Sequence, residues 1–277
     1  MPRVLKLTLA YDGTAYVGWQ RQTSGVSIQG LVEEALTRIE GGPVTIIGAG
    51  RTDAGVHALG QVASAKLSTA IDVSTLRRAL NATLPADVRV VSVDEAPADF
   101  HARYSATGKT YEYWIWLGEV VPPFLRTSCW LIPRTLDVAA MDRAARLLEG
   151  EHDFASFQSA GSGVKTTVRR VKQARVVAGS VPHAASQSLS EAALGAFGGT
   201  PVVFRIEADG FLRHMVRAIV GTLVEVGDRR READSMPAVI AGADRDTAGP
   251  TAPAHGLVLV RVEYGTTGGA SRELSVT

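Results

Sequence analysis

A disulfide within this chain of 277 residues is excluded, because the sequence contains a single cysteine, Cys129. The fold must therefore depend on a packed core, and a chain of this length is large enough to bury one. Such scarcity of cysteine is typical of proteins from a reducing compartment.

Long apolar runs are also missing. No stretch of about 18 uncharged apolar residues occurs, so we expect no membrane-spanning helix. The first residues, Met1–Lys6, contain no apolar region adequate for a secretory signal. We therefore expect a cytoplasmic protein.

The sequence has no excess of charge of either sign, with 29 basic residues, 28 acidic residues and a net charge of +1. This total neither favours nor excludes a nucleic-acid partner. The basic residues, however, are mostly arginine and occur in clusters. The guanidinium group suits phosphate, and a nearly neutral protein can still carry one basic face. Scattered solvated faces are the alternative. The clusters are Arg77–Arg78, Arg103 with Lys109, Arg169–Arg175, Arg213 with Arg217, and Arg229–Arg231.

Hydrophobic periodicity predicts the order βαββαβ in each half of the chain. The first half has strands at Val4–Tyr11, Val44–Gly48, Gln61–Leu67 and Val88–Val93, and helices at Ser27–Glu40 and Ser74–Leu84, the second capped by Ser74. The second half has strands at Lys109–Leu117, Thr166–Val177, Val202–Ala208 and Leu257–Tyr264, and helices at Asp137–Leu148 and Phe211–Val226, with Asp137 as a candidate cap.

This order is that of the ferredoxin-like unit. We therefore expect an α+β fold of two ferredoxin-like βαββαβ units whose antiparallel sheets flank a central catalytic cleft. The predicted boundaries are residues 1–105 for the N-terminal unit, 106–265 for the C-terminal unit and 266–277 for a flexible tail. The segment Gly179–Thr200, rich in alanine, serine and glycine, is expected to be an insertion between two strands.

One loop combines glycines with a single carboxylate. Within Gly48–Gln61, Asp53 lies between glycines, with Arg51 two residues before it and His57 four residues after it. Glycine allows close backbone approach, and loops on rigid scaffolds tend to carry reactive groups. A carboxylate ionised at neutral pH can act as nucleophile, general base or metal ligand. An Asx turn is the structural alternative for Asp53.

No metal-binding motif stands near this loop, and the six histidines are dispersed, so we expect no metal ion. A Ser-His-Asp triad would lack its Gly-x-Ser-x-Gly elbow. Asp53 is therefore the candidate nucleophile or base. Arg51 and His57, in the same loop, are candidate substrate contacts.

A second block, Phe100–Tyr113, alternates basic and aromatic residues at the start of a strand. Aromatic rings can stack on bases, and Arg103 and Lys109 could hold phosphates. On this strand Tyr111 and Tyr113 point to one face, while Trp114 and Trp116 point to the other. We interpret both tryptophans as core residues and Tyr111 as a substrate contact.

A third block, Ala208–Leu223, has an apolar stripe at helical spacing, with Arg213 and Arg217 four residues apart on another face. An arginine close to apolar residues needs a carboxylate or a phosphate as partner, because an unpaired buried charge is costly. Alternatively, both arginines are solvated at the surface. This interpretation suits Arg213 better than Arg217. His214 is interpreted as a surface or capping residue.

Together these blocks resemble the tRNA pseudouridine synthase A family, over nearly the whole chain. The motifs that carry the resemblance are Tyr11–Gly13, Gly18–Gln20, Gly50–Ala58, Phe100–Arg103, Lys109–Tyr111, Asp153–Phe157, Phe211–Arg217 and Gly256–Leu257. The Gly179–Thr200 segment is longer than the family pattern.

This resemblance implies an isomerase that converts uridine to pseudouridine at positions 38, 39 and 40 of the tRNA anticodon stem-loop. It implies no cofactor and no metal, and a homodimer bridged by the RNA. Asp53 matches the catalytic aspartate, Tyr111 the tyrosine that stacks on the target base, and Arg217 an arginine associated with the catalytic carboxylate. Whether Asp53 attacks C1′, attacks C6 or abstracts a proton stays open, as does a role of Tyr111 as a base.

Three other functions are compared with this one. A pseudouridine synthase with another RNA target is the nearest alternative. A non-catalytic RNA-binding protein would carry an aromatic Arg/Lys-Gly-Phe-Gly-Phe signature, which is absent. An aspartic hydrolase needs two matched carboxylates, and Asp246 lies in a polar loop unlike that of Asp53.

Overall fold

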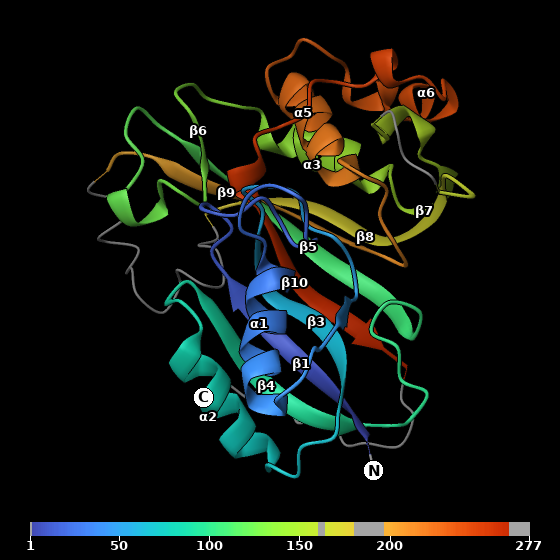
Figure 1. The fold of residues 1–277 in the computed structure, drawn as a ribbon. Coiled ribbons are helices and arrows are strands. Elements are labelled where there is room, and N and C mark those ends of the chain that lie inside the picture. The colour runs from blue at the N-terminus through green and yellow to red at the C-terminus, as the bar shows by residue number, and fades with distance from the viewer. Residues whose placement is uncertain (1, 160–163, 180–196, 266–277) are drawn as a thin grey trace.

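The computed structural model describes residues 2–159, 164–179 and 197–265. Within these ranges ten strands form one sheet, mostly antiparallel, so the fold is α+β as expected (Figure 1). Most of the expected Gly179–Thr200 insertion and the expected tail lie outside the described residues.

The sheet has the order β4-β1-β3-β10-β5-β9-β8-β7, with β2 paired to β3 and β6 paired to β5. The bounds are β1 (Arg3–Tyr11), β2 (Ile46–Gly48), β3 (His57–Leu67), β4 (Val88–Ala96), β5 (Ala106–Leu117), β6 (Trp130–Ile132), β7 (Gly150–Asp153), β8 (Val168–Ala178), β9 (Thr200–Ala208) and β10 (Leu257–Tyr264). The two sheets expected from the sequence are thus joined into one, because β10 pairs with both β3 and β5.

The helices are α1 (Ile28–Glu40), α2 (Val73–Thr83), α3 (Val138–Arg146), α5 (Met215–Gly227) and α6 (Met236–Ala241). In Figure 1, α1 and α2 lie beside the part of the sheet formed by β1, β3 and β4, while α3, α5 and α6 gather near β7 and β8. The cap of α3 at Asp137 is confirmed. The cap of α2 is Asp72 rather than Ser74, because the Asp72 carboxylate accepts the Ser74 and Thr75 amides.

Two boundaries near the candidate site differ from the prediction. Strand β3 begins at His57 instead of Gln61, which shortens the loop that carries Asp53. Helix α5 begins at Met215 instead of Phe211, because His214 has a left-handed backbone with φ of 62° that cannot continue a helix. The short strands β6 and β7 were not predicted.

The two faces of β5 pack into different clusters, as predicted. Tyr111 and Tyr113 belong to the large apolar core, which draws residues from both halves of the chain. Trp114 and Trp116 lie on the opposite face in a smaller cluster and are almost fully buried. Their interpretation as core residues is therefore confirmed.

Candidate active site

The loop that carries Asp53 is fixed by its neighbours on both sides. Trp19 N–H donates to the carbonyl of Thr52 at 3.0 Å, and Gln61 Nε2 donates to the carbonyl of Gly50 at 2.8 Å. The Thr52 hydroxyl also bonds to the Tyr11 hydroxyl at 2.8 Å. Asp53 is thus presented by a braced backbone rather than by a free loop.

Gly18 explains how the segment after β1 can lie against this loop. Its φ is +100°, and a Cβ placed there would lie 2.5 Å from the carbonyl oxygen of Thr52. A side chain at this position would therefore combine a strained backbone with a steric clash. The Gly18–Gln20 motif seen in the sequence is in this way part of the support of Asp53.

The Asp53 side chain is 32% exposed, and two basic groups lie against one of its oxygens. Arg217 Nη1 is 3.4 Å from Oδ2, and His214 Nε2 is also 3.4 Å from Oδ2. Arg217 is itself fixed, because its Nε donates to the carbonyl of Ala252 at 2.7 Å. No backbone amide in the described part of the chain donates to the Asp53 carboxylate, so the Asx turn is not observed.

His214 is a residue that sequence reasoning missed. It was interpreted as a surface or capping residue, yet its side chain makes no cap hydrogen bond and turns to Asp53. Its Nδ1 is 2.6 Å from the hydroxyl of Ser159. The signal in the sequence is weak, because a helical reading of residues 211–226 gives His214 an ordinary helical backbone.

Tyr111 lies on β5, close enough to Asp53 for the carboxylate to affect its pKa. It is 7% exposed, pairs with Leu259 and Ile206 in the neighbouring strands, and meets the Phe211 ring edge-on at a centroid distance of 5.0 Å. Burial raises the pKa of Tyr111, and the nearby Tyr11 and Asp53 raise it further. The phenol is therefore neutral at physiological pH, which does not suit it to act as a base without a change in its surroundings.

Lys109 is the centre of a group of cations near the same loop. Its side chain passes over Gly50, where a Cβ would lie 3.4 Å from Lys109 Cε. Burial lowers the pKa of Lys109, and Arg103 and Arg169 lower it further, partly offset by Asp209. These cations are therefore close enough to repel one another. That arrangement would be relieved by a bound anion.

Arg51 is exposed, and its side chain is the first member of a chain of hydrogen bonds through two glutamine side chains. Its Nε donates to Gln20 Oε1 at 3.1 Å, and Gln20 Nε2 donates to Gln29 Oε1 at 2.6 Å. Gln29 in turn donates to the buried carboxylate of Glu33 at 2.9 Å. The guanidinium thus extends into solvent from a rigid base, two residues from Asp53.

His57 is placed differently from the other predicted contacts. It is 6% exposed, its Nδ1 accepts the Gly13 amide at 3.1 Å, and its Nε2 lies 2.9 Å from the carbonyl of Thr127. Both ring nitrogens are thus used inside the protein. The geometry favours a structural role for His57 over a substrate contact.

Arg213 precedes α5, so the prediction that it shares a helix face with Arg217 is wrong. The left-handed backbone of His214 separates the two residues and leaves the Arg213 side chain exposed. Both arginines lower the pKa of His214, but of the two only Arg217 has a contact with Asp53 among the residues that the structure describes.

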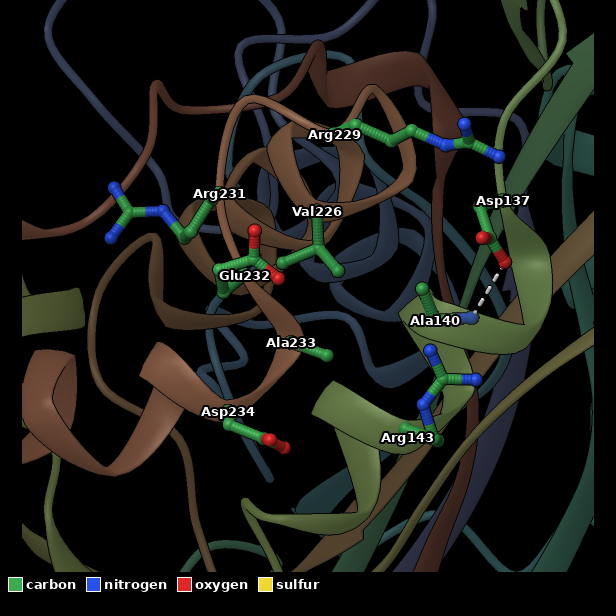
Figure 2. Close-up of a pocket in the computed structure, with 9 residues that line it drawn as sticks. All are labelled: Asp137, Ala140, Arg143, Val226, Arg229, Arg231, Glu232, Ala233 and Asp234. Carbon is green, nitrogen blue, oxygen red and sulfur yellow. Dashed lines mark hydrogen bonds between the residues drawn. The ribbon is translucent and has the colours of Figure 1, made fainter.

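The cluster Arg229–Arg231 lies at the opposite end of α5 from Asp53, beside the pocket shown in Figure 2. Arg231 pairs with Glu225 at 3.0 Å, and Arg230 pairs with Asp228 at 3.1 Å. The pocket wall mixes both signs of charge, which gives it no general preference for an anion. The lining residues are Asp137, Ala140, Arg143, Val226, Arg229, Arg231, Glu232, Ala233 and Asp234.

No group of three or more His, Cys, Asp or Glu side chains in residues 2–159, 164–179 and 197–265 is arranged to hold a metal ion. No helix in these ranges is long and apolar enough to cross a membrane.

Comparison with known proteins identifies the family of the chain. A family model described as tRNA pseudouridine synthase matches residues 8–105 and 144–265. The tRNA pseudouridine synthase A of Moorella thermoacetica is 48% identical over 262 residues, covering 94% of this chain and 99% of that protein. The protein of the same name from Syntrophotalea carbinolica is 43% identical over 261 residues, covering 94% and 96%. That from Roseiflexus castenholzii is 43% identical over 274 residues, covering 99% and 95%.

The candidate site thus combines one carboxylate beside an arginine with a buried tyrosine and nearby cations. With the matches along almost its whole length, the chain belongs to the tRNA pseudouridine synthase family. It is therefore an isomerase of the pseudouridine synthase class.

Proposed function

We propose that this protein converts uridine to pseudouridine at positions 38, 39 and 40 of the tRNA anticodon stem-loop, with Asp53 as the nucleophile. The reaction breaks the C1′–N1 bond and forms a C1′–C5 bond. C5 loses its proton and N1 gains one, so the product is an isomer of the substrate. The observation that carries the proposal is the Asp53 carboxylate, one-third exposed and 3.4 Å from Arg217, on a loop braced from both sides. An ionised carboxylate in such a place can attack either C1′ or C6.

The neighbouring residues have roles that follow from their positions. The target base must leave the stack before it can reach Asp53, at a cost of a few kcal/mol. Tyr111 offsets part of this cost by stacking on the extruded base. Lys109, Arg103, Arg51 and Arg213 hold phosphates of the RNA on either side of the target. Arg217 pairs with Asp53.

Two features of architecture belong to the same proposal. Residues 1–105 and 106–265 form two ferredoxin-like units. The strand orders β4-β1-β3-β2 and β10-β5-β9-β8 support this, because they are the same when the strands of each half are numbered in chain order with β6 and β7 left out. The protein acts in the cytoplasm as a homodimer bridged by tRNA. By light scattering, the free protein should have the molar mass of two chains, and the complex that of two chains plus the bound tRNA.

The test is pseudouridine mapping on unmodified tRNA transcripts. Wild-type protein should modify positions 38–40, and Asp53→Asn should give no product while still binding tRNA. Asp99→Asn, which changes an exposed carboxylate elsewhere, is the matched control and should behave as wild type. Product at another position would retain the chemistry and overturn the specificity. Full activity of Asp53→Asn would overturn the role of Asp53.

A further inference from the structure

His214 has a backbone that its residue type disfavours. It is the residue before α5, with φ of 62° and ψ of 2°. These angles lie in the left-handed region, which glycine adopts readily and histidine rarely. Such conformations persist where the surrounding structure imposes them, and they cluster at functional sites. The side chain does not cap the helix, so capping does not account for histidine here.

The imidazole ring instead has one hydrogen bond, at Nδ1, and one close contact, at Nε2. Nδ1 lies 2.6 Å from the Ser159 hydroxyl, and Nε2 lies 3.4 Å from Asp53 Oδ2. Ser159 is tied to the same segment, because its amide donates to the carbonyl of Arg213 at 3.3 Å. The ring is thus oriented toward the carboxylate from a fixed position.

The protonation state of the ring follows from its surroundings. Burial lowers the pKa of His214, and Arg217, Arg213 and Arg245 lower it further against the opposing effect of Asp53. The ring is therefore neutral at pH 7 and carries one N–H. If the Ser159 hydroxyl donates to Nδ1, that N–H is on Nε2 and faces Asp53.

The carboxylate contacts are uneven. Arg217 and His214 both lie against Oδ2, whereas Oδ1 receives no hydrogen bond or ion pair from the residues that the structure describes. A carboxylate held by one oxygen presents the other in a fixed direction. The free oxygen is the one that can attack the nucleoside.

We propose that His214 is a positioning residue that holds Oδ2 of Asp53 together with Arg217 and so directs Oδ1 at the substrate. The proposal rests on the role of Asp53 given above. Ser159 sets the ring tautomer, and the left-handed backbone brings the ring within reach. His214 acts on the reaction through Asp53 and makes no contact with the RNA.

The test compares kcat, KM and the midpoint of thermal unfolding for two variants, His214→Gly and His214→Asn. Both residues accept a left-handed backbone, so unfolding should not occur at a lower temperature. The expected result is a fall in kcat of about 10- to 100-fold, the effect of losing one polar contact with a charged group, with KM within twofold. Added imidazole should restore part of the kcat of His214→Gly, which a purely structural role would not allow.

The control is Arg229→Gly. Like His214, Arg229 is a non-glycine residue with a left-handed backbone, with φ of 59°, but it lies at the opposite end of α5. Its replacement by glycine should leave kcat unchanged. If His214→Gly has wild-type kcat while Asp53→Asn is inactive, the positioning role is overturned and the function stands. If kcat falls, unfolding shifts to lower temperature and imidazole gives no rescue, His214 is structural only. If Asp53→Asn is active, the proposed function fails first.

Discussion

At the scale of single residues, the most telling contact is that of Arg217 with Asp53. The guanidinium has two fixed partners, the carboxylate at 3.4 Å and the carbonyl of Ala252 at 2.7 Å, and it is 16% exposed. It is therefore placed before substrate arrives. A group placed in advance contributes to the reaction more than to binding.

Arg217→Ala should accordingly reduce kcat by about 10- to 100-fold, the loss of one charged hydrogen bond, and change tRNA affinity by less than twofold. Arg217→Lys keeps the charge but not the planar fork, so it should fall between alanine and wild type. Single-turnover kinetics give the rate, and filter binding gives the affinity. Equal losses in rate and affinity would show that Arg217 acts mainly in RNA binding.

Lys109 gives a prediction about pH. Burial and the neighbouring Arg103 and Arg169 lower its pKa below the ordinary 10.5, so it loses its charge at a lower pH than an exposed lysine. RNA binding favours the protonated form, and tRNA affinity should therefore fall as pH rises from 7 toward 10. Lys109→Arg, which stays charged, should show a smaller fall in filter-binding titrations at matched ionic strength. Parallel pH profiles would exclude Lys109 from phosphate binding.

Some of the candidate site could be predicted from the sequence at this scale. Asp53 and Arg217 were named from a glycine-rich loop and an apolar helix, and they lie in contact. His214 was not, because its position depends on a left-handed backbone and on Ser159, which is 55 residues away in the chain. Local periodicity carries no information about such a contact. The hydrogen bonds of the His57 ring with the carbonyls of Thr127 and His255, both distant in the chain, are of the same kind.

At the scale of elements, the regular patterns were informative and the boundaries less so. Strand β10 has the predicted bounds, because an apolar run between turn residues specifies both its ends. Helix α5 was predicted four residues too long at its start, because Phe211 and Leu212 continue the apolar pattern although the backbone turns at His214. A turn imposed by tertiary contacts overrides the local preference.

Gly18 lies where the segment after β1 contacts the loop that carries Asp53. Gly18→Ala places a Cβ 2.5 Å from the Thr52 carbonyl on a backbone with φ of +100°, so it should cost roughly 1–3 kcal/mol of unfolding free energy and also reduce kcat by displacing Asp53. Gly41→Ala is the matched control. Gly41 has φ of +77° but open space around it, so only the backbone cost applies and kcat should not change. Urea unfolding and steady-state kinetics measure both effects. Wild-type kcat in Gly18→Ala would mean that the Asp53 loop does not depend on this contact.

At the scale of the whole molecule, the structure sorts the basic clusters that the sequence could only count. Several cations of the Arg169–Arg175 cluster have carboxylate partners, such as Lys172 with Glu207 and Arg175 with Glu149. At Lys109, by contrast, two arginines, Arg103 and Arg169, lower the pKa and one carboxylate, Asp209, opposes them. A net charge of +1 therefore conceals a local positive field at the site.

The joining of the two halves is the other feature that the sequence could not provide. The strands of each half lie together in the sheet. The sheet is nevertheless continuous, because β10 lies between β3 and β5. Pairing of strands some 200 residues apart depends on packing and not on local pattern. The apolar core likewise includes residues of both halves, so we expect them to unfold together.

Substitution of Leu259 tests whether the two halves unfold together. It is fully buried in β10, opposite Ala58 of β3 on one side and Tyr111 of β5 on the other. Leu259→Ala should lower the free energy of unfolding by about 2–5 kcal/mol, because the cavity falls where the halves meet. Native-state hydrogen exchange should then show protection reduced by the same factor in β1 and in β9. Val91→Ala, at an exposed position, should change neither. A loss of protection confined to β9 would mean that the halves unfold independently and that the continuous sheet does not couple them.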